Sequence, residues 1–293
     1  MSQEISMVAN PRMVADNDEV LIQPIQPAFG AEISNVDLRH PLPPATFDKI
    51  RSAFIKYKVI FFRDQDITTE NQVDFARLFG DIQEYPVFSS AENPAIQGLK
   101  SKYARADIWH TDLAWLTRPP FAAVLRSRVV PDVGGDTMWA DGERAYGNLP
   151  DDLKSRIDEL YLVHDSSRIG AHYQSGEERE RRLTRVRELR KEYPMIAHPI
   201  APIHPETGRR YLFVNPALAE SIVGLSNAES RELLARLHQE ILRPENTLRF
   251  RWSKNAIGMW DERRTLHYGV YDYGDQERVM ERVIIAGRDI PSW

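Results

Sequence analysis

Two short segments that lie far apart in the sequence carry the residue types of a metal site. The first is Trp109-His110-Thr111-Asp112, and the second ends at His267. Two histidines and one carboxylate are the ligands with which non-haem Fe(II) oxygenases hold iron on one face and leave the other face open. The sequence therefore indicates an iron site formed by His110, Asp112 and His267, with oxygen-dependent chemistry.

The spacing of His110 and Asp112 fits this interpretation if the segment is extended. Apolar residues precede the pair (Ile108 and Trp109) and follow it from Leu113, which predicts a half-buried strand. On a strand, residues i and i+2 point to the same side, so both side chains would reach one cation. The alternative for this pair is a buried ion pair or a hydrogen-bonded turn.

Two other His-x-acid pairs are present, whereas 8 histidines and 43 acids in 293 residues supply about one such pair by chance. His238 and Glu240 fall within a predicted helix, where residues two apart point in nearly opposite directions. His204 and Glu206 precede Thr207-Gly208, which predicts a surface turn. Neither of these pairs is favoured as a pair of ligands.

Two arginines follow the second segment. Arg278 and Arg282 lie four residues apart on a predicted strand, and therefore on one face. Guanidinium groups turned into a β-rich core are unfavourable unless they meet anions. A dicarboxylate cosubstrate or an anionic substrate is a natural partner for them. The alternative is two surface arginines on an edge strand.

Hydrophobic periodicity predicts the elements that must position these residues. Helical spacing is found over 46–57, 70–79, 150–162 and 226–242, with capping boxes at Thr69 with Gln72 and at Ser226 with Glu229. Strand patterns are found over 21–38, 59–62, 121–130, 136–139, 248–252, 256–260 and 278–286. Short strands separated by turns, with scattered helices, predict a mainly β (α+β) sandwich or barrel decorated by helices.

No internal repeat or linker divides the chain. We therefore expect a flexible tail over 1–19 and a single domain over 20–293, with a charged helical insert at about 170–195. The charge is concentrated between Glu177 and Glu192, where a solvated helix face is favoured over a nucleic-acid or partner site. A lid over the site is a second interpretation of this excursion.

Composition excludes several classes of site. The chain has no cysteine, so disulfides, thiolate zinc sites and cysteine nucleophiles are excluded. The absence of cysteine also fits a protein of the reducing cytosol. A net charge of -5 disfavours a surface that follows nucleic-acid phosphates. The sequence has neither the apolar core of a secretory signal nor the roughly 18 apolar residues of a membrane span. We expect a cytoplasmic protein whose partner is a small-molecule substrate, with no nucleic acid and no membrane as partner.

Several short motifs occur in an order that is specific to one family. In chain order they are Phe29-Gly30-Ala31-Glu32-Ile33, Phe75-Ala76-Arg77-Leu78-Phe79-Gly80, Trp109-His110-Thr111-Asp112, Gly134-Gly135-Asp136-Thr137, His204-Pro205-Glu206-Thr207-Gly208-Arg209, Leu212-Phe213-Val214-Asn215, Trp260-Asp261, His267-Tyr268, Asp272-Tyr273, Arg278 and Arg282. With this set the chain resembles the taurine dioxygenase (TauD/TfdA) family of Fe(II)- and 2-oxoglutarate-dependent dioxygenases, from about Ile22 to Gly287.

The resemblance implies a double-stranded β-helix, the cupin-like jelly-roll core. It also implies Fe(II) held by His110, Asp112 and His267, with 2-oxoglutarate and O2 as cosubstrates. The expected reaction hydroxylates a substrate and releases succinate and CO2. If the oxidised carbon bears oxygen, nitrogen or sulfur, the product falls apart and a bond is cleaved.

The resemblance assigns further roles around the metal. Thr137 and Arg278 would hold the distal carboxylate of 2-oxoglutarate. Arg282 would lie near the carboxylate next to the iron and near the anionic end of a substrate. The backbone at Leu113 would face the substrate.

Departures from the family pattern concern the substrate. Taurine-binding members have a histidine at the position of Tyr85, a tyrosine near Phe88 and an asparagine near Ala106, so taurine would lose most of its polar partners here. We therefore expect a substrate other than taurine, small, anionic and partly apolar, that contacts Tyr85 and Phe88. Tyr103 and Trp115 also indicate a partly apolar substrate. The alternative for about half of these aromatic residues is an ordinary place in the core.

Two other readings remain open. One is a non-catalytic binding protein on the same jelly-roll scaffold, and the other is a hydrolase or zinc enzyme with the same three ligands. Because family members often form dimers or tetramers, the resemblance also implies a homo-oligomer.

Overall fold

The computed structural model describes residues 19–84, 93–100, 106–166, 180, 184, 187–188 and 190–293. Tyr85, Phe88, Tyr103 and all but the last residue of the predicted tail lie outside the described residues. Within the charged insert, the described residues from Glu180 to Glu192 are helical, as expected.

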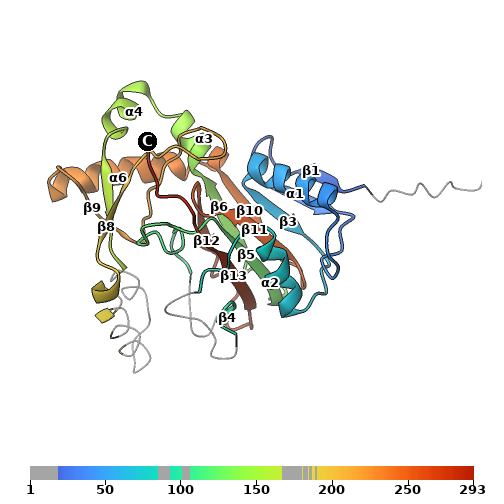
Figure 1. Cartoon of the computed structure of the whole chain (residues 1–293). Coiled ribbons are helices and arrows are strands. Elements are labelled where there is room, and N and C mark those ends of the chain that lie inside the picture. The colour runs from blue at the N-terminus through green and yellow to red at the C-terminus, as the bar shows by residue number, and fades with distance from the viewer. Residues whose placement is uncertain are drawn as a thin grey trace, which may run out of the picture.

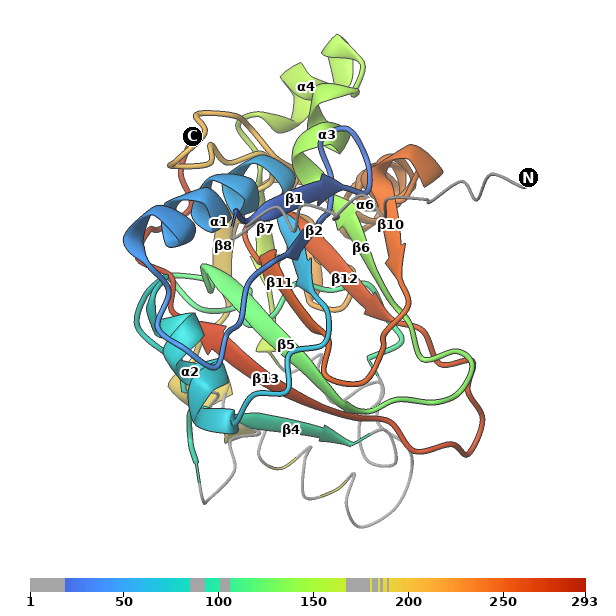
Figure 2. The same cartoon turned by 90° about the vertical axis from the view of Figure 1, so that its right-hand side faces the viewer.

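A seven-stranded sheet forms one side of the core (Figure 2). In spatial order its strands are β1 (Leu21–Pro24), β2 (Ala31–Ser34), β3 (Val59–Phe62), β11 (Ile257–Asp261), β5 (Ala122–Val129), β13 (Val279–Ile285) and β4 (Gln97–Lys100). Neighbouring strands are antiparallel except β2 and β3. Phe61 faces the second sheet, while Ile60 and Phe62 face the helices, because successive side chains of a strand alternate between its faces.

A smaller sheet packs against the inner face of the large one. It consists of β10 (Thr247–Phe250), β6 (Thr137–Asp141) and β12 (Thr265–Gly269), all antiparallel. Phe61 stacks on Phe250 with ring centroids 3.9 Å apart, and Trp139 meets Trp260 at 5.7 Å. Two sheets that are antiparallel except at the β2–β3 pair, and that pack through such a core, form a jelly roll, so the predicted fold class is confirmed.

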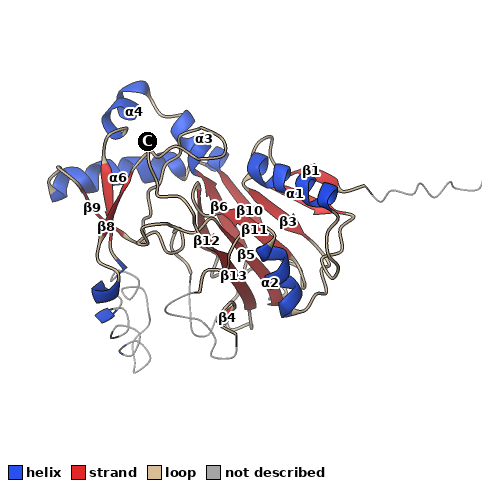
Figure 3. Cartoon of the chain, in the orientation of Figure 1, coloured by secondary structure: helices blue, strands red, loops and turns tan. Residues whose placement is uncertain are grey.

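Helices cover both outer sides of this core (Figures 1 and 3). Helices α1 (Pro44–Tyr57) and α2 (Thr69–Arg77) lie on the large sheet, over a second apolar cluster. The remaining elements lie beyond the small sheet, where a third apolar cluster joins β12 to several of them. The remaining elements are α3 (Gly142–Gly147), α4 (Asp151–Ile157), α6 (Asn227–Ile241), the 3-10 turn η2 (Pro244–Asn246) and a third sheet with the order β8 (Ile196–Pro199), β7 (Tyr161–His164) and β9 (Ala219–Ile222).

Local predictions were right for most long elements and wrong at particular ends. The capping box at Ser226 and Glu229 is confirmed. The other lies one residue earlier than predicted, at Thr68 and Asn71, because Gln72 is buried and donates to the backbone of Val124 and Glu281. The helix predicted over 150–162 ends at residue 157, and strand β7 follows it. None of the described helices combines the length and the apolar character needed to cross a membrane.

Candidate metal centre

The three predicted ligands meet at one place in the structure. Ligand atoms of His110, Asp112 and His267 all lie within 4.8 Å of one another. Nε2 of His110 is 3.8 Å from Oδ1 of Asp112, and Nε2 of His267 is 3.9 Å from Oδ2 of the same carboxylate. In the part of the chain that the structure describes, this is the one group of at least three His, Cys, Asp or Glu side chains placed to share a metal ion.

Backbone pairing holds the first ligand segment against β12. The amide of His110 donates to the carbonyl of His267 (3.0 Å), and the amide of His267 donates to the carbonyl of His110 (2.8 Å). The Thr111 hydroxyl donates to the carbonyl of Thr265 (2.9 Å), and the Asn215 amide donates to the carbonyl of Thr111 (2.8 Å). His110 and His267 are therefore fixed relative to each other by main-chain geometry.

The predicted strand through Asp112 is wrong. After the single bridge at His110 the chain turns, and Leu113 lies in the left-handed region at φ 49°. Leu113, Ala114 and Trp115 are all buried, so the apolar run reflects a turn enclosed by core and not an alternating strand. Asp112 reaches the histidines from this turn.

The donor set fits a divalent metal. Nδ1 of His110 lies 2.7 Å from the carbonyl of Ile108, which fixes the proton on Nδ1 and leaves the lone pair of Nε2 for a metal. Nε2 of His267 faces the same carboxylate. Two imidazoles and one carboxylate that converge from one side suit Fe(II) and leave positions open for other ligands.

Electrostatics keep the three ligands in their metal-binding forms. Burial alone would raise the pKa of Asp112, but Arg282, His267 and His110 around it lower this pKa to about 2. Burial, together with the neighbouring His110, lowers the pKa of His267 well below its usual value. A carboxylate and a neutral imidazole are the protonation states that bind metals.

Arg282 lies directly beside the ligands. On β13 its side chain points into the core, where Nη1 donates to Oδ2 of Asp112 and Nε donates to Oε1 of Gln97 (2.9 Å). Gln97 is buried on the edge strand β4. The structure thus places a fixed cation at the metal centre, at the position that the family resemblance implied for Arg282.

Arg278 reaches from the start of β13 in the large sheet to Thr137 in the small sheet. It immediately precedes β13, and its Nε donates to the carbonyl of Gly135 (2.8 Å) while Nη2 donates to the hydroxyl of Thr137 (3.3 Å). The indole of Trp252 also donates to this hydroxyl (2.9 Å). Because two N–H groups occupy its lone pairs, the Thr137 hydroxyl is left to donate its own proton to an acceptor. Arg278 and Thr137 therefore form a paired donor site for an anion.

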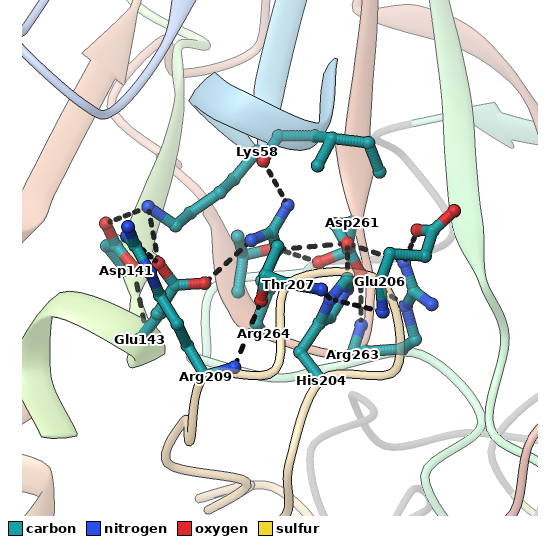
Figure 4. Close-up of polar contacts among 12 residues, drawn as sticks. Lys58, Asp141, Glu143, His204, Glu206, Thr207, Arg209, Asp261, Arg263 and Arg264 are labelled. Atoms are coloured by element: carbon teal, nitrogen blue, oxygen red, sulfur yellow. Dashed lines mark hydrogen bonds and ion pairs between the residues drawn. The ribbon is translucent and has the colours of Figure 1, made fainter. Parts of the chain in front are cut away.

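A buried ionic network supports the turn between β11 and β12 (Figure 4). Arg263 donates to both oxygens of Asp261 (2.9 Å each), and Arg264 donates to Asp261 (3.1 Å) and to Glu143 (2.7 Å). Lys58 lies 3.0 Å from Asp141 and 3.7 Å from Glu143. Burial would raise the pKa of Asp261, but the two arginines hold it well below its usual value.

His204 belongs to this network and not to the metal centre. It is fully buried, so the predicted surface turn is wrong for its side chain. Its Nε2 lies 3.0 Å from Asp261, and its Nδ1 accepts from the amides of Glu206 and Thr207. A ring with this pattern is neutral, and burial lowers its pKa. His238 and Glu240 lie on α6, as predicted, away from the ligand group.

His164 is a fully buried histidine that belongs neither to the metal centre nor to the ionic network. It is fully buried against His198 and Phe213, and neither ring nitrogen has a hydrogen-bond partner in the described residues. Burial, with the neighbouring His198, lowers the pKa of His164 to about 3. The folded state therefore keeps His164 neutral at pH values where an unfolded chain would protonate it.

His164→Leu is expected to weaken the acid sensitivity of folding. Above about pH 6.5 the ring of His164 is neutral in both states of the wild type, so its protonation does not lower the free energy of unfolding. As pH falls from 6.5 toward 3, the unfolded state binds a proton that the folded state excludes, so the free energy of unfolding falls. Between pH 6 and 4 the free energy of unfolding of the variant should fall less steeply, by up to about 1.4 kcal/mol per pH unit. Urea unfolding across that range measures the slope. Phe213→Leu, which removes packing but no titrating group, should lower stability without changing the slope, and an unchanged slope in His164→Leu would contradict the assignment.

The structure describes three of the other positions considered for the substrate site, Leu113, Trp115 and Ala106. Leu113 is buried in the turn beside Asp112, and Trp115 is core. Ala106 is exposed, and its carbonyl accepts from the amide of Gly269, two residues beyond His267. The predicted substrate contacts at Tyr85 and Phe88 lie outside the described residues.

Sequence reasoning missed two residues of the site. Gln97 carries no motif, and nothing in the sequence links it to Arg282. Glu262 is fully buried, and its Oε2 accepts from the amide of Asp112 (3.0 Å). Its place directly after the Trp260-Asp261 motif was the available signal.

A family model described as taurine catabolism dioxygenase TauD, TfdA family matches residues 21–284. An alkylsulfatase of Acinetobacter baylyi is 39% identical over 264 residues, which cover 88% of this chain and 82% of the relative. An alpha-ketoglutarate-dependent sulfate ester dioxygenase of Pseudomonas putida is 35% identical over 277 residues, covering 92% and 90%.

The fold is likewise similar to a solved structure. A taurine dioxygenase from Burkholderia xenovorans superposes with a TM-score of 0.78 at 32% identity, covering 93% of this chain and 90% of that one. Similarity over nearly the whole of both chains means that the jelly roll and the helices around it are shared.

Proposed function

Because this chain belongs to the TauD/TfdA family, we propose that it is a sulfate ester dioxygenase, which oxidises the carbon that carries the ester oxygen of an alkyl sulfate. Membership confirms the resemblance seen in the sequence. The chain is a 2-oxoglutarate-dependent non-haem iron dioxygenase, with Fe(II), 2-oxoglutarate and O2 as cofactor and cosubstrates. The substrate class is the new element of the proposal.

The observation that carries the substrate class is the buried guanidinium of Arg282 at the metal centre. A permanent cation next to the ligands favours a substrate whose anionic group lies close to the carbon that is oxidised. A sulfate ester has this form, since one oxygen separates the sulfur from that carbon. The similarity to proteins named as an alkylsulfatase and as a sulfate ester dioxygenase supports the same class.

Thr137 and Arg278 are proposed to hold the distal carboxylate of 2-oxoglutarate. In the register of the small sheet, His267 faces Trp139 and Gly269 faces Thr137. Two residues along a strand span roughly 6.8 Å, comparable with a five-carbon dicarboxylate. A cosubstrate whose keto acid end meets the metal would thus present its other carboxylate to the hydroxyl of Thr137 and the guanidinium of Arg278.

The metal, when bound, would supply the oxygen activation that replaces a C–H bond by C–OH. The residues of this chain bind and orient the reactants, because the hard chemistry belongs to the metal. Hydroxylation of R–CH2–O–SO3⁻ gives R–CH(OH)–O–SO3⁻, which collapses to an aldehyde and hydrogen sulfate. The overall balance is one alkyl sulfate, one O2 and one 2-oxoglutarate consumed, with one aldehyde, one hydrogen sulfate, one succinate and one CO2 formed.

The lost taurine contacts support a substrate other than taurine. Ala106 offers only a methyl group beside Gly269, where taurine-binding members have an amide. Tyr85, Phe88 and the backbone at Leu113 are proposed to line the apolar part of the substrate site. Such a lining suits an alkyl chain better than an ammonium group.

Hexyl sulfate is expected to be oxidised, whereas taurine is not. The purified enzyme with Fe(II), ascorbate and 2-oxoglutarate should release sulfate and succinate in a one-to-one ratio from hexyl sulfate. Hexane-1-sulfonate, which lacks only the ester oxygen, is the matched comparison substrate, and its oxidation would release sulfite. Succinate release that follows taurine or hexane-1-sulfonate more strongly than hexyl sulfate would contradict the proposed class.

We further propose that residues 20–293 form one dioxygenase domain, which acts in the cytoplasm as a homo-oligomer, a dimer or a tetramer. An exposed apolar group near the C-terminus supports self-association. Tyr161 and Trp293 are in ring contact at 4.5 Å, and Ile203, whose amide donates to Ser292, is exposed beside them. Light scattering on the purified protein measures the oligomeric state.

A further inference from the structure

Glu262 is a buried acidic residue to which neither the family resemblance nor the comparisons assign a role. It lies in the turn between β11 and β12 and has no exposed surface. Its Oε1 accepts from the indole of Trp260 (2.7 Å), and its Oε2 accepts from the amide of Asp112 (3.0 Å). A buried carboxyl needs such donors, but these two do not use all of its acceptor capacity.

His267 has a buried ring nitrogen that lacks a hydrogen-bond acceptor within the described part of the chain. Its Nε2 faces Asp112, whereas its buried Nδ1 has no hydrogen-bond partner in the described residues. The nearest acidic oxygen is Oε2 of Glu262, 4.0 Å from Nδ1. His110, by contrast, already has the carbonyl of Ile108 on its Nδ1. Histidine ligands almost always donate their second N–H to a carboxylate, a carbonyl or water, so His267 lacks the partner that His110 has.

We infer that Glu262 is a positioning residue that accepts the Nδ1–H of His267 when the metal is bound, and so ties two metal ligands to one carboxyl group. The inferred hydrogen bond requires the 4.0 Å separation to shorten by roughly 1 Å, to a normal length of about 2.9 Å. The gap is too short for a bridging water, which would need about 5 Å between the two atoms. One carboxyl group would then fix the backbone of Asp112 and the tautomer of His267.

The ionic network explains how Glu262 is held in place. Asp261 and Arg263 flank it in the turn, and Arg264 fastens the same turn to Glu143 and to the carbonyl of Ile55 (Figure 4). The side chain of Glu262 therefore projects from a turn that is fixed on its other side. This inference rests on the metal centre of the proposed function.

Glu262→Gln tests the inference with a change of one atom. The amide must turn its NH2 toward one of the three N–H donors, so the metal ligands lose part of their support. We expect Co(II), used as the probe in place of Fe(II), to dissociate about 10- to 100-fold more readily than from wild type. Glu240→Gln, the same substitution at a buried carboxylate of α6 that pairs with Arg236 and Arg243 and touches neither the ligands nor this turn, should keep the wild-type affinity for Co(II).

Proton NMR of the Co(II) protein gives a readout beyond affinity. In wild type, two solvent-exchangeable, paramagnetically shifted imidazole N–H signals are expected, one from each histidine ligand. In Glu262→Gln one signal should shift or broaden by exchange. Wild-type affinity with both signals unchanged in Glu262→Gln would overturn the inference.

The wild-type spectrum also tests the inference without a variant. Rapid exchange of one of the two N–H protons in wild type would overturn it, even if Glu262→Gln did not fold. Failure of wild type to bind Co(II) would instead count against the metal centre itself, so the two failures are distinguishable.

Discussion

His267→Ala is expected to reduce turnover by more than about a thousandfold, because metal-ion catalysis supplies several kcal/mol and the variant keeps only two of three ligands. In the variant, Nε2 of His110 and Oδ1 of Asp112, 3.8 Å apart, are still available to a metal. These two ligands alone cannot form the three-ligand set of two histidines and one carboxylate. The loss should appear both in succinate release and in the affinity for Fe(II). An isotope-labelled 2-oxoglutarate assay and an anaerobic metal titration measure the two effects.

His238→Ala is the matched control for this experiment. His238 lies on α6 and belongs to no metal-binding group in the described residues. The control should keep iron affinity and turnover near wild type. Turnover near wild type in His267→Ala would show that the metal centre has been assigned to the wrong residues.

Arg278→Ala is expected to raise the KM for 2-oxoglutarate by roughly 30- to 1,000-fold, which corresponds to about 2 to 4 kcal/mol for truncating one partner of a buried charge pair. The guanidinium is held by Gly135 and Thr137, so it is presented in a fixed orientation to the distal carboxylate. The KM for the alkyl sulfate should change much less. Steady-state kinetics with each reactant varied in turn separates the two.

Thr137→Val and Arg278→Lys should produce smaller increases in the KM for 2-oxoglutarate. Valine removes the hydroxyl but keeps the shape, and lysine keeps the charge but loses the planar fork, so both should raise the KM for 2-oxoglutarate by less than Arg278→Ala. If Arg278→Ala raises only the KM for the substrate, the roles proposed for Arg278 and Arg282 are wrong.

The ligand set could be predicted from sequence because it depends on residue types and on a family pattern, and not on fold details. His110, Asp112 and His267 converge in the structure as expected. The route by which Asp112 arrives there was not predictable, because a fully buried turn and a fully buried strand give the same apolar run. Two hydrogen bonds stabilise the turn, one donated by the Thr111 hydroxyl to the carbonyl of Thr265 and one donated by the Asn215 amide to the carbonyl of Thr111, and both depend on residues far away in the chain.

Strand β12, which carries His267, was also not predicted. The four residues before it, Asp261 to Arg264, are all charged, and such a run usually marks an exposed loop. Here all four are buried, because Asp261 pairs with the two arginines, Arg264 also pairs with Glu143, and Glu262 accepts from Trp260 and Asp112. Partners contributed by distant segments decide such cases, and one sequence does not reveal them.

Anaerobic titration of the metal-free protein with Fe(II) and 2-oxoglutarate tests the central claim most directly. A visible metal-to-ligand charge-transfer band should appear only when both are present, with one equivalent of each at saturation. The band should be absent in His267→Ala. No band from correctly folded wild-type protein would contradict the account, because His110, Asp112 and His267 would then not form an iron site to which the keto acid binds.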